Sequence, residues 1–244
     1  MIIYAKDAMQ IDIPWIEPHT HLPEDFTILI YGQRRSGKST WMTWLMYCLQ
    51  HHFDHVVCFC STGFENYFQQ FMNPKLCFSE YREEVLQKVL DRQADEITKK
   101  QSDSKHVVPR VLVILDDVLQ HETEFRQSNA LRTVFTAGRH FGISCIFATQ
   151  YAKSIPPTFR QNADMVVVFF VFSQEQMKIF HDEYGTMLDR AEFASLIEQA
   201  TVDHIAFVVR PCSGGRTMAE YYGLTRAQKH KSFYIGKPPS DSDD

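Results

Sequence analysis

The segment Gly32–Thr40 constrains this chain more than any other stretch. It reads Gly-Gln-Arg-Arg-Ser-Gly-Lys-Ser-Thr, so two glycines five positions apart come before a lysine and two hydroxyl residues. An apolar, β-prone run precedes it over 26–31, and an apolar run long enough for a helix follows over 41–49. Strand, glycine-rich loop and helix in this order are the setting that a phosphate-binding P-loop requires.

The residue types in this loop predict its chemistry. Glycines at 32 and 37 let the backbone curl so that its N–H groups point at phosphate oxygens, and a helix that begins at Lys38 adds its positive dipole end. We expect Lys38 to reach the β- and γ-phosphates of ATP and the Ser39 hydroxyl to bind Mg²⁺. A glycine-rich turn that matches by chance is the alternative. The predicted nucleotide-binding residues are Gly32, Arg34, Arg35, Ser36, Gly37, Lys38, Ser39 and Thr40.

A second diagnostic element lies about 75 residues further along the chain. Arg110 is followed by five apolar residues that end in Asp116 and Asp117. This pattern is typical of a buried parallel strand whose carboxyl end enters a nucleotide crevice. We expect Asp116 to bind Mg²⁺ directly or through water. Asp117 stands where P-loop ATPases carry the acidic residue that orients and deprotonates the attacking water.

Another predicted core strand, 143–150, ends in Thr149 and Gln150. An amide beside the acidic strand can lie near the γ-phosphate and sense hydrolysis, so we expect Gln150 to have a sensor role. The alternative is a polar residue that only satisfies backbone groups at a strand end.

Composition limits the classes of protein that this chain can belong to. The formal net charge is −5 over 244 residues, so no global basic field indicates nucleic acid, and any DNA contact has to be local. The six cysteines form no C-x-x-C pair and are typical of a reducing compartment. Neither a signal peptide nor an apolar run of the ~20 residues that span a membrane is present. We therefore expect a soluble intracellular protein.

Strands and helices alternate along the chain, which predicts an α/β fold with a mainly parallel central sheet flanked by helices. Such a sheet gives a three-layer P-loop NTPase of the RecA-like, additional-strand type. We expect an N-terminal arm over 1–25, an ATPase domain over 26–235 and a disordered acidic tail over 236–244. An amphipathic helix is predicted over 82–100, where apolar residues recur on one face. Further helices are predicted over 128–141, 174–184 and 188–199, and further strands over 55–60, 165–171 and 204–209.

The motifs taken together resemble a known family. The order P-loop, acidic strand, then Gly138–Ile143 running into Ala148-Thr149-Gln150 is similar to the FtsK/HerA superfamily of DNA-pumping ATPases. Within it, Gln150-Tyr151 followed by Ile155-Pro156-Pro157 and Arg160–Asp164 resembles the genome-packaging ATPases of poxviruses, giant viruses and their virophages. The resemblance covers about residues 26–171, and the last 70 residues add little to it.

The resemblance implies a homo-oligomeric ring, a hexamer or a pentamer, with double-stranded DNA through its pore and ATP between neighbouring subunits. It gives Lys38 and Asp117 catalytic roles and makes Arg139 or Arg160 the candidate for an arginine finger from the next subunit. It also implies a capsid or vertex protein as partner and a virus factory in the host cytoplasm as the location. One departure concerns Asp117, because many superfamily members carry the longer glutamate there, which leaves the base assignment less secure than that of the metal ligand.

Two other functions compete with a motor that packages a viral genome. The first is a P-loop kinase that transfers phosphate to a nucleoside or polynucleotide, but the chain shows no arginine-rich lid between its core strands. The second is a non-catalytic assembly factor regulated by nucleotide, against which the intact Lys38, Ser39, Asp116 and Asp117 argue. The most basic stretch, 210–231, is a candidate for DNA or capsid contact, and a solvated surface is its alternative.

Overall fold

The computed structural model describes residues 2–4, 10–60, 65–118, 127–170 and 173–238. The chain folds into two compact units, each formed by several segments. The first unit contains Met1–Pro23, Ile28–Leu45 and Ala148–Lys229, and the second contains Glu24–Thr27, Met46–Phe147 and His230–Asp244.

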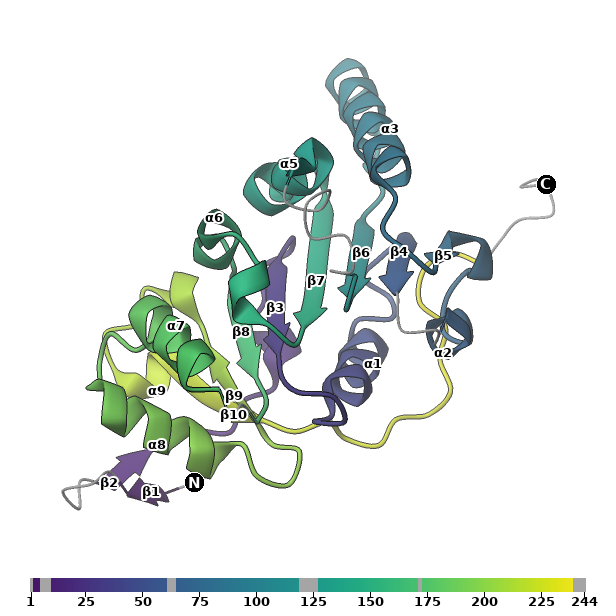
Figure 1. The fold of residues 1–244 in the computed structure, drawn as a ribbon. Coiled ribbons are helices and arrows are strands. Elements are labelled where there is room, and N and C mark those ends of the chain that lie inside the picture. The colour runs from purple at the N-terminus through teal and green to yellow at the C-terminus, as the bar shows by residue number, and fades with distance from the viewer. Residues whose placement is uncertain (1, 5–9, 61–64, 119–126, 171–172, 239–244) are drawn as a thin grey trace. The chain divides into compact units, whose positions relative to one another are not determined.

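The strands of the first unit follow the order β10, β9, β8, β3 (Figure 1). Strands β3 and β8 pair in parallel, whereas β8 with β9 and β9 with β10 pair antiparallel. Every residue of these strands is buried, as expected for strands covered on both faces. Their bounds are β3 Thr27–Tyr31, β8 Met165–Val168, β9 Ala206–Val209 and β10 Tyr222–Thr225.

Helices α7 and α8 pack against each other in the first unit, and α8 also contacts β9. The start of α8 is fixed by a capping box, in which Asp189 accepts from the amide of Glu192 and the Glu192 carboxylate accepts from the amide of Asp189. The helices that begin in this unit are α1 Lys38–Cys48, α6 Pro157–Gln161, α7 Gln174–Tyr184, α8 Arg190–Ala200 and α9 Met218–Tyr221. A hairpin of β1 (Ile2–Tyr4) and β2 (Gln10–Asp12) lies beside α8.

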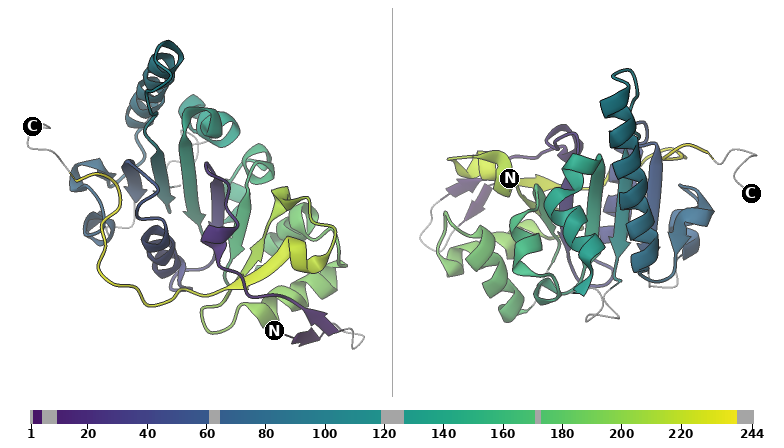
Figure 2. Two further views of the ribbon diagram at one scale, coloured as in Figure 1. Left: turned by 180° about the vertical axis from the view of Figure 1, so that it is seen from behind. Right: turned by 90° about the horizontal axis from the view of Figure 1, so that it is seen from above.

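The strands of the second unit follow the order β7, β6, β4, β5, and β4 pairs in parallel with both of its neighbours. Helices α3 and α5 pack against each other (Figure 2). The buried amide of Gln93 on α3 donates to the carbonyls of Pro109 and Phe141, which join this helix to the starts of β6 and β7. The bounds are β4 His55–Cys60, β5 Cys77–Phe78, β6 Val111–Asp116, β7 Ile143–Thr149, α2 Glu65–Gln69, α3 Glu83–Ser102 and α5 Asn129–Ala137.

The predicted fold class is confirmed, because the chain is a mixed α/β protein with a mainly parallel central sheet. In the part of the chain that the structure describes, each helix is too short or too polar to cross a bilayer. The predicted boundaries of arm, ATPase domain and tail stay a prediction, and most of the tail lies outside the described residues.

Several elements differ from the sequence-based expectation, among them β8, which ends at Val168 within the predicted strand 165–171. Helix α5 ends at Ala137, and a 3₁₀ turn, η4 (Gly138–Phe141), takes its place because Gly142 follows in the left-handed region with φ 63°. The predicted strand over 204–209 begins at Ala206, since His204 has a φ of 61°, which no strand accommodates. Strand β10 was not predicted, because its sequence Tyr-Gly-Leu-Thr is short and contains a glycine.

Candidate nucleotide-binding site

The predicted P-loop connects β3 to α1 within the first unit. Strand β3 ends at the buried Tyr31, and the Gly32 amide then donates to the carbonyl of Thr149 at 3.3 Å. Helix α1 begins at Lys38, so its first N–H groups face the loop. Strand, loop and helix therefore have the arrangement that the sequence predicts for phosphate binding.

Both glycines of the loop are required by geometry. A Cβ at Gly32 would lie 2.6 Å from the Ser36 Oγ and 2.7 Å from the Phe169 Cβ, closer than real atoms approach. Gly37 has a φ of 108°, which side chains rarely tolerate. Arg35 also adopts a positive φ, 66°, so this loop holds backbone strain of the kind that gathers at binding sites.

The polar groups of the loop fit a triphosphate. The Ser36 Oγ is buried and has no hydrogen-bond partner among the described residues, so it is a donor available to a bound acceptor. The Lys38 side chain is only 6% exposed, and its Nζ donates to the carbonyls of Gly32 at 2.8 Å and Gln33 at 3.0 Å. Because hydrogen bonds to ionised oxygens are stronger than those to neutral carbonyls, phosphate oxygens are better acceptors for this ammonium.

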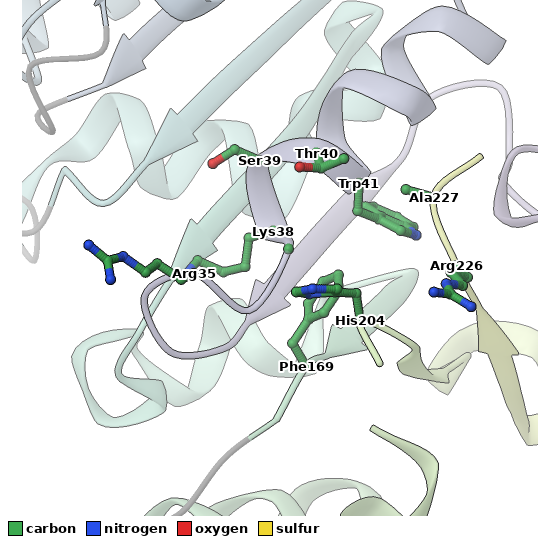
Figure 3. Close-up of a pocket in the computed structure, with 10 residues that line it drawn as sticks. Arg35, Lys38, Ser39, Thr40, Trp41, Phe169, His204, Arg226 and Ala227 are labelled. Atoms are coloured by element: carbon green, nitrogen blue, oxygen red, sulfur yellow. The ribbon is translucent and has the colours of Figure 1, made fainter. Parts of the chain in front are cut away.

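A cavity of about 410 Å³ opens over this loop. Figure 3 shows that its walls come from the P-loop, from the start of α1 and from three later segments, while the Arg35 side chain points away from the other sticks. The lining contains lysine and arginine but no carboxylate among the described residues, so it favours an anionic ligand. The lining residues are Arg35, Gly37, Lys38, Ser39, Thr40, Trp41, Phe169, His204, Arg226 and Ala227.

The sequence analysis did not assign five of these lining residues to the site: Trp41, Phe169, His204, Arg226 and Ala227. His204 and Arg226 are the two basic residues among them. His204 lies in the turn before β9, where Asp203 and His204 both have positive φ values, 51° and 61°. Its Nδ1 lies 3.1 Å from the carbonyl oxygen of Ser36, so the imidazole can donate to the P-loop backbone. Arg226 directly follows β10. No local pattern marks either residue, since each is more than 160 positions away from the loop.

Gln150, the predicted sensor, lies in the same unit as the P-loop. It directly follows Thr149, whose carbonyl accepts from the Gly32 amide at 3.3 Å and whose Oγ1 accepts from the Tyr151 amide at 3.2 Å. The end of β7 is thus joined to the start of the P-loop through backbone contacts. This places Gln150 next to a residue that contacts the loop, as its expected role requires.

The acidic pair Asp116 and Asp117 belongs to the second unit. Asp116 is the last residue of β6 and is 5% exposed, and its Oδ2 accepts from the Cys60 thiol at 3.7 Å. Asp117 is more exposed and has a left-handed backbone, with φ 51°. A non-glycine residue rarely adopts this conformation, and such outliers gather at functional sites. The predicted sharing of Mg²⁺ between Asp116 and Ser39 stays a prediction.

The two candidate arginine fingers have very different surroundings. Arg139 lies in η4 and is exposed, and its guanidinium makes no hydrogen bond or ion pair with the described residues. Arg160 lies in α6 and is 8% exposed. Its nitrogens donate to the Glu183 carboxylate at 2.8 and 3.2 Å and to the carbonyls of Ile155 at 2.6 Å and Ala152 at 3.3 Å. These contacts favour a structural role for Arg160.

Comparison with known proteins gives the family. The sequence matches the Poxvirus A32 protein family over residues 18–198, which is more than half of the chain. This chain belongs to the Poxvirus A32 protein family. The chain is also similar to the uncharacterized protein 075L of Invertebrate iridescent virus 6, with 26% identity over 184 residues that cover 75% of this chain and 69% of the relative.

Two solved structures share the fold of this A32 family member. The genome packaging NTPase B204 of Sulfolobus turreted icosahedral virus 2, in complex with AMP, has a TM-score of 0.58 at 15% identity. The match covers 87% of this chain and all of B204. The pCW3 conjugation coupling protein TcpA with ATPγS has a TM-score of 0.61 at 13% identity, covering 96% of this chain and 66% of TcpA. The family resemblance inferred from the motifs is therefore confirmed, and the fold is that of P-loop NTPases.

Proposed function

We propose that this A32 family member is an ATP-hydrolysing motor that translocates double-stranded DNA and packages a viral genome into a capsid. The observation that carries the proposal is the anion-binding cavity over the P-loop, with its buried Lys38 and its unpartnered Ser36 hydroxyl. Family membership and the fold shared with B204, a genome packaging NTPase, support this choice over other P-loop functions.

Hydrolysis requires an attacking water, a base and a stabilised leaving group. We propose that Asp117 orients the water and accepts its proton while the water oxygen bonds to the γ-phosphorus. The bond from that phosphorus to the β–γ bridging oxygen then breaks, which gives ADP and phosphate. Lys38 and the loop amides neutralise charge on the phosphate oxygens. The same amides bind the phosphates of the leaving ADP.

A magnesium ion fits the donor set of this proposal. Hydroxyl and carboxylate oxygens are the ligands that Mg²⁺ takes in P-loop enzymes, and Ser39 and Asp116 are the residues that would hold it. When bound, the ion supplies further neutralisation of the β- and γ-phosphate oxygens. Gln150 is proposed to sense the γ-phosphate, because it adjoins the residue that contacts Gly32.

The motor is proposed to be a ring, a hexamer or a pentamer, with each nucleotide at a contact between subunits. Arg139 is the proposed finger, because an exposed guanidinium without a partner among the described residues is available to a neighbouring subunit. The chain has a formal net charge of −5, so its contact with DNA has to be local, and the pore of a ring would provide such a local contact. A capsid or vertex protein is the proposed attachment point for such a ring, in a virus factory of the host cytoplasm.

ATP hydrolysis with and without double-stranded DNA tests this function. We expect wild-type protein to hydrolyse ATP faster with DNA, and Lys38→Ala to lower the rate by at least about a hundredfold without loss of fold. Lys88→Ala, which removes an exposed lysine on α3 outside both the cavity and the basic stretch 210–231, is the matched control and should keep the wild-type rate.

Each other outcome identifies a competing function. An unchanged rate with and without DNA, at several salt concentrations, contradicts the motor. Transfer of labelled γ-phosphate to a nucleoside or a DNA end instead of water indicates the kinase. Zero turnover in an assembled oligomer with Mg²⁺ present indicates an assembly factor regulated by nucleotide.

A further inference from the structure

Arg226 has no part in the chemistry proposed above, yet the fold places it at the nucleotide cavity. It directly follows β10, whose last residue, Thr225, is fully buried. The Thr225 Oγ1 accepts a hydrogen bond from the indole Nε1 of Trp41 at 3.4 Å. Since Trp41 lies in the first turn of α1, this buried contact holds the end of β10 beside the start of the P-loop helix.

The Arg226 side chain is available to a ligand. It is exposed, it lines the cavity of about 410 Å³, and it makes no hydrogen bond or ion pair with the described residues. Figure 3 shows Arg226 and Ala227 on the segment that leaves β10, on the opposite side of the picture from Arg35. Because the described lining has no carboxylate, nothing in it neutralises this guanidinium.

The position of the phosphates decides which part of a nucleotide faces Arg226. Lys38 and the loop amides take the phosphate chain, with the lysine at its β- and γ-phosphates. Thr225, the residue before Arg226, is hydrogen-bonded to Trp41. On α1, Trp41 lies three residues after Lys38 and so nearly one helical turn further from the loop. The remaining wall of the cavity, formed by Thr40, Trp41, Arg226 and Ala227, therefore faces the nucleoside half.

We propose that Arg226 binds the nucleoside half of the nucleotide, with its planar guanidinium stacked on the base. This inference rests on the proposed function of the P-loop as a nucleotide site. A guanidinium suits this task because it stacks on aromatic rings and is weakly hydrated, whereas an ammonium is a compact, strongly hydrated charge. The stacking gives the site its preference for a nucleotide over an inorganic polyphosphate.

Equilibrium binding with two probes tests this assignment. We expect Arg226→Ala to weaken the binding of ATP and ADP about tenfold, while the affinity for inorganic tripolyphosphate stays within about twofold. Arg226→Lys keeps the charge without the plane, so it should behave like Arg226→Ala. Lys229→Ala removes an exposed cation from the same segment and should leave both affinities unchanged. Thermal unfolding of each variant checks that the fold is intact, as expected for substitutions of exposed residues.

Other results overturn the inference in distinguishable ways. If Arg226→Ala loses equal affinity for ATP and for tripolyphosphate, Arg226 binds the phosphates. If Arg226→Lys has the wild-type affinity for ATP, Arg226 acts through its charge and not through stacking. An unchanged ATP affinity in Arg226→Ala removes it from the site. If wild-type protein binds neither probe in the presence of Mg²⁺, the proposed function fails and the inference fails with it.

Discussion

Arg139 and Arg160 lie before and after β7 in the sequence, and they differ in exposure and in hydrogen-bond partners. Arg139, in the 3₁₀ turn before the strand, is exposed and without a partner among the described residues. Arg160, in the short helix after it, is buried with Glu183 and two backbone carbonyls as acceptors. Motif analysis treated both as finger candidates. The comparison teaches that the partners of a cation, more than its place in a motif, separate a role in catalysis from a role in folding.

The largest effect should come from the exposed member of the pair. We expect Arg139→Ala to slow ATP hydrolysis by roughly 10³-fold in the assembled oligomer, because a finger stabilises charge that builds on the γ-phosphoryl oxygens. Arg132→Ala, a nearby exposed arginine on α5, is the control and should keep the wild-type rate. Steady-state phosphate release measures both.

A mixing experiment decides whether Arg139 acts on a neighbouring subunit. Arg139→Ala subunits keep an intact P-loop, and Lys38→Ala subunits keep the finger, so mixed rings should regain activity where the two kinds meet. A mixture as inactive as either variant alone indicates that Arg139 acts within its own subunit or has no catalytic role.

The buried member should instead determine stability. We expect Arg160→Ala to lower the free energy of unfolding of the first unit by about 3–5 kcal/mol, because it leaves Glu183, 15% exposed, as a buried charge without its partner. The double variant Arg160→Met with Glu183→Leu removes both charges and should recover most of this loss. Arg190→Ala, an exposed arginine at the start of α8, is the control and should change stability by under about 0.5 kcal/mol. Denaturant unfolding measures all of them, and a stable but inactive Arg160→Ala would reverse the comparison.

His204 is exposed like Arg139 but, like Arg160, it has a hydrogen-bond partner. Its replacement should have the smallest effect on ATP hydrolysis. Its ring is exposed but has one contact, from Nδ1 to the Ser36 carbonyl at 3.1 Å. Loss of one neutral hydrogen bond of about 1 kcal/mol should raise the KM for ATP about fivefold in His204→Ala, with kcat nearly unchanged. His204→Gly also loses the contact, so it should raise the KM for ATP as His204→Ala does, although glycine adopts the left-handed backbone at this position, φ 61°, without strain. His51→Ala, another exposed histidine, should leave KM as it is, and a wild-type KM in His204→Ala would show that the contact does not shape the loop.

Local sequence patterns predicted much of the fold. The segments that became β3, β4, β6 and β7 are rich in apolar residues, and such segments are typical of strands in a sheet covered on both faces. Helix α3 was predicted from its periodic apolar face, which buries Leu86 and Leu90. The end of α5 was predicted too late. The apolar pattern extended the helix to Phe141, whereas the chain forms η4 over Gly138–Phe141 and turns at Gly142, which has a left-handed backbone.

The basic stretch 210–231 shows what such patterns leave out. Its contact with DNA or a capsid protein stays a prediction, whereas the structure shows that its middle contains a fully buried strand, β10. Strand burial depends on pairing with β9, and that pairing joins residues whose own sequence carries a weak strand signal. Arg226 became a cavity residue only because Thr225 is tied to Trp41, 184 positions away.

The sequence by itself determined the P-loop, its strand and its helix, and the residue types at the acidic strand end. It could do so because glycine spacing and apolar runs act on the backbone over short distances. Only the tertiary structure decided that Arg160 is paired with Glu183, that His204 contacts the loop, and that Arg226 lines the same cavity as the loop. Hydrogen bonds and charges act over a few ångströms in space. The partners of a side chain are therefore set by which distant segments the fold brings together.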